Sequence, residues 1–195
     1  MGDRRTFFTS CFDEHADVLA ATRDVCAADI DAMADAWAET IRGGGKILFF
    51  GNGGSAGDAQ HLATELTVRF KQDRAPISAI ALTTDSSTLT AIGNDYGFER
   101  LFARQVEALA RPGDLVLGIS TSGKSPNVLA GMAAAKAAGA RAAAFSGCGG
   151  GPLADAADLC ITVPSDSTAR IQEMHILIGQ MLCAALEIDL GLAEG

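Results

Sequence analysis

The chain has 195 residues, of which 48% are hydrophobic and 20% charged, and its formal net charge is −9. This length suits one well-packed α/β domain, and the composition is that of a folded protein rather than a disordered one. The excess of acidic residues argues against a general nucleic-acid surface, which would need a basic stripe. An anionic substrate can still bind, because nearby backbone amides and helix dipoles outweigh a distant acidic surface.

The five cysteines are scattered, odd in number and without a C-x-x-C pair, as is typical of reduced thiols in an intracellular protein. The chain does not open on the charged and then apolar pattern of a leader, and no uninterrupted apolar run approaches about 18 residues. We therefore expect a cytoplasmic protein that neither crosses a membrane nor binds nucleic acid.

Two amphipathic helices are predicted before the first strand, over residues 3–22 and 24–42. Each has an apolar face with helical spacing. The first face carries Phe8, Phe12, His15 and Leu19, and the second carries Cys26, Ile30, Met33, Trp37 and Ile41. A small sheet needs fewer helices, so residues 1–45 are expected either to cover the sheet or to pack on a neighbouring subunit.

Apolar runs that read as strands then alternate with helical patterns. Strands are expected at residues 46–50, 77–82, 115–119, 142–145 and 159–163. Helices are expected at residues 56–69, in a short stretch ending at 92, at 98–110, from Pro126 to Gly139 and at 169–190. This alternation predicts a parallel sheet covered on both faces, with the site at the carboxyl ends of its strands. No domain boundary is visible, so residues 1–195 are expected to form a single domain.

The first strand leads into a glycine-rich loop, residues 51–55, and then into a helix that carries His61 and Glu65. The glycines let the backbone turn sharply and approach a ligand closely. Ser55 is expected to cap the helix, whose start offers free N–H groups and positive dipole charge to an anion. A phosphate or sugar site is one interpretation of this stretch, and an ordinary tight loop is the other.

A second polar loop follows the third expected strand and contains four hydroxyl side chains, those of Ser120, Thr121, Ser122 and Ser125. Hydroxyls and exposed helix N–H groups suit the peripheral oxygens of a phosphate monoester. Residues 118–125 also match the G-x-x-x-x-G-K-S pattern of a nucleotide-binding P-loop. Against that alternative, the match follows the third strand rather than the first, and no apolar run ending in a magnesium-binding Asp accompanies it.

Six segments in unbroken order, spread over nearly the whole chain, resemble the phosphoheptose isomerases of the sugar isomerase (SIS) domain family. They are Gly-Asn-Gly-Gly-Ser at 51–55, Asp-Ala-Gln-His-Leu-Ala-Thr-Glu at 58–65, Leu-Thr-Thr-Asp at 82–85, Ala-Ile-Gly-Asn-Asp-Tyr-Gly-Phe at 91–98, Ser-Thr-Ser-Gly-Lys-Ser at 120–125 and Ala-Arg-Ile-Gln-Glu-Met-His at 169–175. The resemblance implies interconversion of sedoheptulose 7-phosphate and D-glycero-D-manno-heptose 7-phosphate for bacterial heptose synthesis. It also implies a flavodoxin-like SIS fold with a five-stranded parallel sheet, a homotetramer with sites at subunit interfaces, and a zinc ion in several members.

The same resemblance implies roles for individual residues. The residues expected to bind the sugar phosphate are Asn52, Gly53, Gly54, Ser55, Glu65, Asn94, Asp95, Ser120, Thr121, Ser122, Ser125 and Gln172. Those at the family's metal-ligand positions are His61, Glu65, Gln172 and Gln180. The catalytic positions are those of Glu65 and Gln180.

Glu65 is the expected base of the reaction. Aldose–ketose isomerisation moves a proton between C1 and C2, most simply through an enediol, and needs a base for the carbon-bound proton. Glu65 lies four residues after His61, so both side chains project from one helical face. The alternative is an ordinary surface His–Glu contact. Because a zinc-bound carboxylate is a poorer base, the roles of base and metal ligand compete at Glu65.

Position 180 departs from the family, which usually has a histidine there. An amide cannot titrate, and its oxygen is a weaker zinc ligand than an imidazole. Gln172 and Gln180 share a helix face but lie about 12 Å apart along the axis, which makes convergence on one ion difficult. Three hypotheses stay open: an active isomerase, a non-catalytic SIS-domain protein such as a replication-initiation regulator, and a chain inactivated by an introduced glutamine. Glu65 favours the enzyme, whereas His15 and His175 are expected to be structural.

Overall fold

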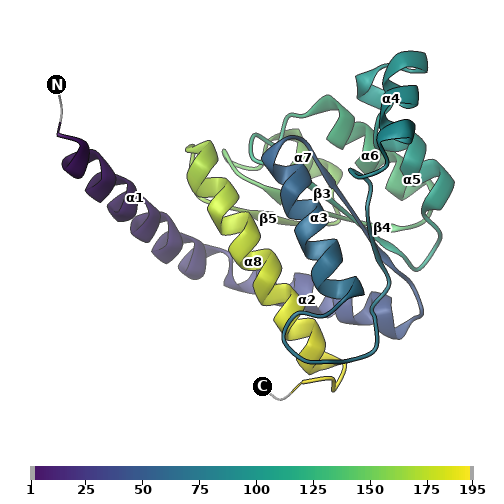
Figure 1. Cartoon of the computed structure of the whole chain (residues 1–195), viewed down its shortest axis with the longest axis horizontal. Coiled ribbons are helices and arrows are strands. Elements are labelled where there is room, and N and C mark those ends of the chain that lie inside the picture. Colours follow the sequence, from purple (N-terminus) through teal and green to yellow (C-terminus); the bar gives the residue numbers. More distant parts are fainter. Residues whose placement is uncertain (1–2, 194–195) are drawn as a thin grey trace.

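A computed structural model describes residues 3–193 of the chain. At its centre lies a parallel sheet with the strand order β2-β1-β3-β4-β5, the order of flavodoxin-like folds, which confirms the expected fold class (Figure 1). The strands are β1 (Ile47–Gly51), β2 (Ala79–Ala81), β3 (Leu115–Ser120), β4 (Arg141–Ser146) and β5 (Leu159–Thr162). The helices are α1 (Arg4–Val25), α2 (Ala27–Arg42), α3 (Gly54–Thr67), α4 (Ser86–Asp95), the 3-10 turn η1 (Phe98–Arg100), α5 (Ala103–Leu109), α6 (Pro126–Ala137), α7 (Gly151–Ala156) and α8 (Thr168–Asp189).

Two hydrophobic cores lie on opposite faces of the sheet, and successive residues of β1 point into each of them. Phe49 meets the ring of Trp37 from α2 edge-on, at a centroid distance of 5.5 Å. Phe50 stacks on Phe102 on the other face, at 4.8 Å. Because helices cover both faces, every residue of β1 and β3 is buried, which explains why their sequences are apolar without alternation.

The short helix expected to end at residue 92 is longer, because α4 continues to Asp95. Asp85 caps this helix, since its carboxylate accepts two backbone N–H groups of the first turn at 3.0 and 3.1 Å. The chain turns away at Gly97, whose φ of 83° favours glycine. The short helix α7 was not expected, because six residues are too few to show a helical period.

The amino-terminal half of α1 projects away from the rest of the molecule (Figure 1). Its three phenylalanines are largely exposed, at 61% for Phe7, 54% for Phe8 and 77% for Phe12. Nearer its carboxyl end, His15 Nδ1 lies 2.7 Å from Glu173 Oε2 of α8. Of the two amino-terminal helices, α2 packs on the sheet. α1 instead presents an apolar stripe that the described chain leaves uncovered.

α8 is long and apolar enough, by length and mean hydropathy alone, to be compared with a membrane span. It nevertheless lies within one core, where Met174, Ile178, Leu182 and Leu186 are at most 1% exposed. Core helices of soluble proteins have the same length and composition, so this helix gives only weak support for a membrane span.

His175 is a core residue, as expected, and is 1% exposed. Its Nε2 donates a hydrogen bond to the carbonyl oxygen of Ser146, at 3.0 Å, and its ring packs against Phe145. Burial lowers the pKa of His175 from 6.5 to about 4, and the hydrogen bond to Ser146 offsets part of this effect. The imidazole is therefore neutral in the folded protein at neutral pH.

We predict that His175 makes folding less favourable at acid pH. Between pH 6.5 and about 4 the unfolded chain binds a proton at this histidine and the folded chain does not, so the free energy of unfolding falls as the pH falls. The shift corresponds to a loss of about 3 kcal/mol, at roughly 1.36 kcal/mol per pKa unit. The free energy of unfolding, measured with urea at several pH values, should fall less steeply over this pH range for His175→Gln than for wild type. An equal pH dependence of the two free energies would contradict the prediction. His15→Gln serves as the control.

Candidate active site

The two polar loops meet because β1 and β3 are parallel neighbours, with Gly51 in register with Ile119. Asn52 of the first loop and Asn127 at the start of α6 join the loops directly. Each side-chain amide donates to the oxygen of the other, and both distances are 2.8 Å. Asn127 is 2% exposed and Asn52 is half-buried, so this reciprocal pair is a partly buried link between the loops.

The first loop enters α3 differently from the expectation. Gly53, not Ser55, is the residue before the helix, and its φ of 57° lies in the region that favours glycine. Ser55 lies inside the first turn, where its side chain is buried, so the expected Ser55 cap is wrong. The chain can still turn sharply here, because Gly53 adopts a backbone conformation that most residues avoid.

Three of the four hydroxyls of the second loop cluster at the start of α6. Ser120 Oγ lies 3.0 Å from Ser125 Oγ and 3.4 Å from Ser122 Oγ, and the backbone N–H of Lys124 donates to Ser122 Oγ at 3.3 Å. Thr121, the fourth, is half-buried beside them. The loop turns at Gly123, where a side chain would collide with the carbonyl of Gly150. These hydroxyls lie at the positive end of the α6 dipole and form a set of donors suited to a phosphate group.

α3 and α8 lie side by side, and their facing residues bring three predicted site residues together (Figure 1). His61 Nε2 lies 3.0 Å from Glu65 Oε1 on the same helix face. Across the helix pair, Gln180 Nε2 lies 3.3 Å from His61 Nε2. Glu65 is less exposed than His61, with side-chain exposures of 22% and 45%. A carboxylate and an imidazole are thus held in contact at an accessible surface, as general acid–base chemistry requires.

Gln172 lies elsewhere on this helix pair, against Gly54 at the start of α3. Its amide fills the position that a side chain at Gly54 would occupy, so glycine is needed there. Gln172 also lies close to Asp58, a buried carboxylate whose Oδ2 has no partner among the described residues. Burial raises the pKa of Asp58, and Gln172 and the nearby His61 offset part of this rise. The sequence analysis missed Asp58, although its spacing of three residues from His61 places both near one helix face.

The residues at the metal-ligand positions do not make a complete zinc site in the described chain. Protein zinc sites use three or four ligands drawn from Cys, His, Asp and Glu. No group of three such side chains converges within residues 3–193, where His61 contacts Glu65 and the amide of Gln180. Gln172 contacts Asp58 and Gly54 instead. The donor set is therefore one strong ligand short.

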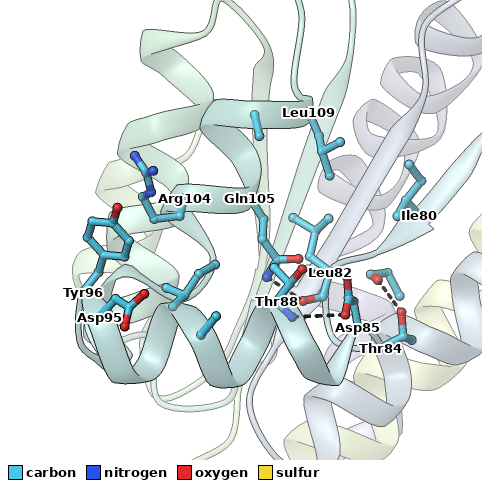
Figure 2. Close-up of a pocket in the computed structure, with 14 residues that line it drawn as sticks. Ile80, Leu82, Thr84, Asp85, Thr88, Asp95, Tyr96, Arg104, Gln105 and Leu109 are labelled. Atoms are coloured by element: carbon cyan, nitrogen blue, oxygen red, sulfur yellow. Dashed lines mark hydrogen bonds between the residues drawn. The ribbon is translucent and has the colours of Figure 1, made fainter.

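No described contact connects Asn94 and Asp95 to the loops. Asn94 donates to Asp95 at 2.7 Å, and Asp95 borders a different cavity of about 500 Å³ between β2, α4 and α5 (Figure 2). In the same cavity the guanidinium of Arg104 lies 4.6 Å from the ring centroid of Tyr96. The cavity at the first loop is smaller, about 150 Å³, and includes Asn52 and Gly53 in its lining.

Comparisons with known proteins identify the family of the chain. The sequence model of the SIS domain matches residues 11–147. Phosphoheptose isomerase of Paramagnetospirillum magneticum is 52% identical over 93% of this chain and 95% of its own length, and that of Roseiflexus is 56% identical over 88% and 87%. The chain belongs to the phosphoheptose isomerase family. Among solved structures, phosphoheptose isomerase from Neisseria gonorrhoeae is 39% identical, with a TM-score of 0.91 over 95% of this chain and all of that chain. The enzyme from Francisella tularensis is 37% identical, with a TM-score of 0.93 over 96% and 100%.

Membership of the phosphoheptose isomerase family bears on the second loop. Its letters match a P-loop, but they occur in a SIS domain after β3, the middle strand of the sheet. The family therefore favours a sugar-phosphate loop over a nucleotide-binding one. Asn127, which the sequence analysis also missed, stands directly after this loop at the second position of α6.

We predict that Asn127→Ala weakens sugar-phosphate binding. The substitution leaves the half-buried Asn52 amide without its partner, and the loss of a hydrogen bond of this kind costs about 0.5–1.5 kcal/mol. The two loops should then no longer be held together, and calorimetry should show sugar-phosphate affinity about tenfold lower or worse. Gln72→Ala, in an exposed connector, is the control. Unchanged affinity in Asn127→Ala would show that the amide pair does not matter for binding.

Proposed function

We propose that this protein is an isomerase that interconverts sedoheptulose 7-phosphate and D-glycero-D-manno-heptose 7-phosphate in bacterial heptose biosynthesis, and that it works in the cytoplasm. The carrying observation is that one chain, 52% identical to a named phosphoheptose isomerase, has both a His61–Glu65 pair and a hydroxyl-rich loop. The loop supplies the binding of the phosphate. The pair supplies the acid–base chemistry of the isomerisation.

Phosphate binding in this proposal uses the side chains of Ser120, Ser122 and Ser125, with Thr121 beside them. Their hydroxyls donate to the peripheral phosphate oxygens, and the dipole of α6 adds positive potential. Asn52 and the backbone of Gly53 and Gly54 lie toward the sugar. Binding of the phosphate at the loop fixes the far end of the substrate, so that the reacting carbons can be held near α3.

The proton transfers in this proposal centre on Glu65. Its carboxylate takes the proton from C1 of the ketose, and the electrons of that C–H bond form the enediol double bond as the carbonyl oxygen gains a proton. Returning the proton to C2, while the hydroxyl on C1 loses its own, gives the aldose. His61, 3.0 Å from Glu65, is the titratable group closest to it and is suited to the oxygen-bound proton.

We predict that Glu65→Gln removes turnover and leaves phosphate binding nearly intact. Glutamine keeps the size of the side chain but cannot take a proton, and general acid–base catalysis is worth roughly 10²–10⁴-fold. Turnover of sedoheptulose 7-phosphate and calorimetric binding of sugar phosphate should be measured on the same preparation. Gln60→Ala, on an exposed position of the same helix, is the matched control. Full turnover in Glu65→Gln would refute the assignment of the base.

The second candidate is a non-catalytic SIS-domain protein that binds a sugar phosphate and regulates a partner. The observation that favours it is Gln180, an amide where the family usually has a titrating histidine, 3.3 Å from His61. This candidate predicts sugar-phosphate binding without turnover in the wild-type chain. Tight binding with no turnover in both wild type and Gln180→His would favour it over the isomerase.

We propose further that zinc binds this chain only weakly, because Gln180 replaces a strong ligand. Gln180→His should place a third zinc ligand beside His61 and Glu65 and thus tighten zinc binding at least tenfold. Competition with a chelating dye measures this affinity without reference to turnover. His61→Ala in the Gln180→His background is the control and should abolish the gain. Equal zinc affinity in wild type and Gln180→His would contradict the proposal.

A homotetramer is our proposal for the assembly, and the uncovered stripe of α1 supports it. The helix is about 33 Å long at 1.5 Å per residue, and its exposed phenylalanines would each gain about 1.5–3 kcal/mol from burial. A groove of about 530 Å³ between α1, α2 and α8, lined largely by apolar side chains such as Leu19, Ile30 and Met181, continues this surface. A second copy of the chain offers matching apolar faces to both.

We predict that Phe8→Glu with Phe12→Glu splits the assembly into smaller species. The two charges would have to be buried in the interface, and they are costly to desolvate. Sedimentation velocity at micromolar concentration should show a tetramer for wild type and for Ser10→Glu, which adds a charge to the opposite face of α1. A wild-type monomer at this concentration would contradict the proposed assembly.

A further inference from the structure

A buried ion pair joins the connector after α3 to the carboxyl end of α8. Arg74 Nε donates to Glu187 Oε1 at 2.8 Å, and both side chains are 2% exposed. Glu187 also accepts the backbone N–H of Phe70 at 3.2 Å. This connector passes beside the last turn of α8 (Figure 1).

The same arginine holds the end of α3. Its Nη2 donates to the carbonyl of Glu65 at 2.8 Å, and its Nη1 donates to the carbonyl of Leu66 at 2.8 Å. These carbonyls belong to the last turn of a helix that ends at Thr67 and has no basic residue of its own in that turn. Carbonyls there lack helical partners. Arg74 donates hydrogen bonds to two of them and adds the positive charge that a helix end favours.

Stability alone is a weak reason for such a pair. Removing two charges from water is costly, and well-packed apolar residues often replace a buried ion pair without loss of stability. The particular effect of this pair is geometric. One guanidinium links α8, through Glu187, to the backbone of Glu65, whose side chain lies beside His61. His61 in turn contacts Gln180 of α8.

We propose that Arg74, held by Glu187, is a positioning residue for the isomerisation: it fixes the last turn of α3, and with it the Glu65 carboxylate, against α8. This inference rests on the proposed function, in which Glu65 is the base. Small displacements of a catalytic group lower the rate steeply, because the reacting atoms must lie within about 3–3.5 Å of each other. The phosphate loop, which follows β3, does not depend on this clamp.

The test compares kcat, KM and the dissociation constant of inorganic phosphate across a set of variants. Glu187→Gln should lower kcat about 10–100-fold and change KM and phosphate affinity less than twofold. Arg74→Met should lower kcat at least as much. Arg74→Lys should fall between wild type and Arg74→Met, because a single ammonium cannot span Glu187 and both carbonyls as a guanidinium does.

The deciding variant is the double change Arg74→Met with Glu187→Met. An apolar pair should regain most of the thermal stability that either single change loses, yet it cannot hold the Glu65 carbonyl. We therefore expect a stable double variant with kcat as low as that of Arg74→Met. Return of kcat together with stability would overturn the proposal, because it would show that the ion pair serves folding alone.

Asp114→Asn is the matched control. Asp114 is 5% exposed and pairs with Lys46 at 2.6 Å between the starts of β1 and β3, at the opposite end of the sheet from the loops. It should lower the melting temperature and leave kcat unchanged. An equal loss of kcat in Glu187→Gln and Asp114→Asn, corrected for the folded fraction, would also overturn the proposal.

Glu65→Gln separates this inference from the proposed function. If Glu65→Gln is inactive while the Arg74 and Glu187 variants keep wild-type kcat, the positioning role fails and the base assignment stands. If Glu65→Gln keeps its turnover, or wild type has none, both the positioning role of Arg74 and the assignment of Glu65 as the base fail.

Discussion

The parallel pairing of β1 with β3 is the constraint on which the rest of the site depends. Residues of β1 lie in register with residues of β3, so the loops that follow these strands leave the sheet side by side. Each loop leads into a helix start, and the positive dipole end of a helix favours an anion. The Asn52–Asn127 amide pair then joins the loops, which makes their relative position a property of the core rather than of two flexible segments.

A second constraint is the close packing of α3 against α8, which two glycines make possible. A side chain at Gly179 would collide with Leu62, and one at Gly54 would collide with the Gln172 amide. The helices therefore approach closely at two positions along their length. The packing at Gly54 buries Asp58 beside Gln172, and the packing at Gly179 brings Gln180 to His61. The chemistry of the site is thus distributed along a helix pair and not confined to the loops.

The hydroxyl cluster and the His61–Glu65 pair lie on different elements of the fold. The hydroxyl cluster lies at the middle of the sheet, on a loop whose glycine turn packs against the Gly150 segment. His61 and Glu65 lie on a helix face that is partly open to solvent. Active sites usually exclude water during proton transfer, so an exposed pair of this kind is consistent with a further chain covering it. The uncovered phenylalanines of α1 are consistent with the same arrangement.

The sequence by itself determined the features that depend on near neighbours in the chain. Periodicity located the five strands and most helices, and the four-residue spacing of His61 and Glu65 placed them in contact, because local geometry decides both. The sequence did not reveal that α4 runs on to Asp95, where the helix stops just before the chain turns away at Gly97. Only the tertiary structure decided which distant residues meet. Asn52 pairs with Asn127, 75 residues away, and Gln180 rather than Gln172 lies beside His61, 119 residues away. These contacts follow from strand register and helix packing, which bring together residues whose spacing in the sequence carries no period.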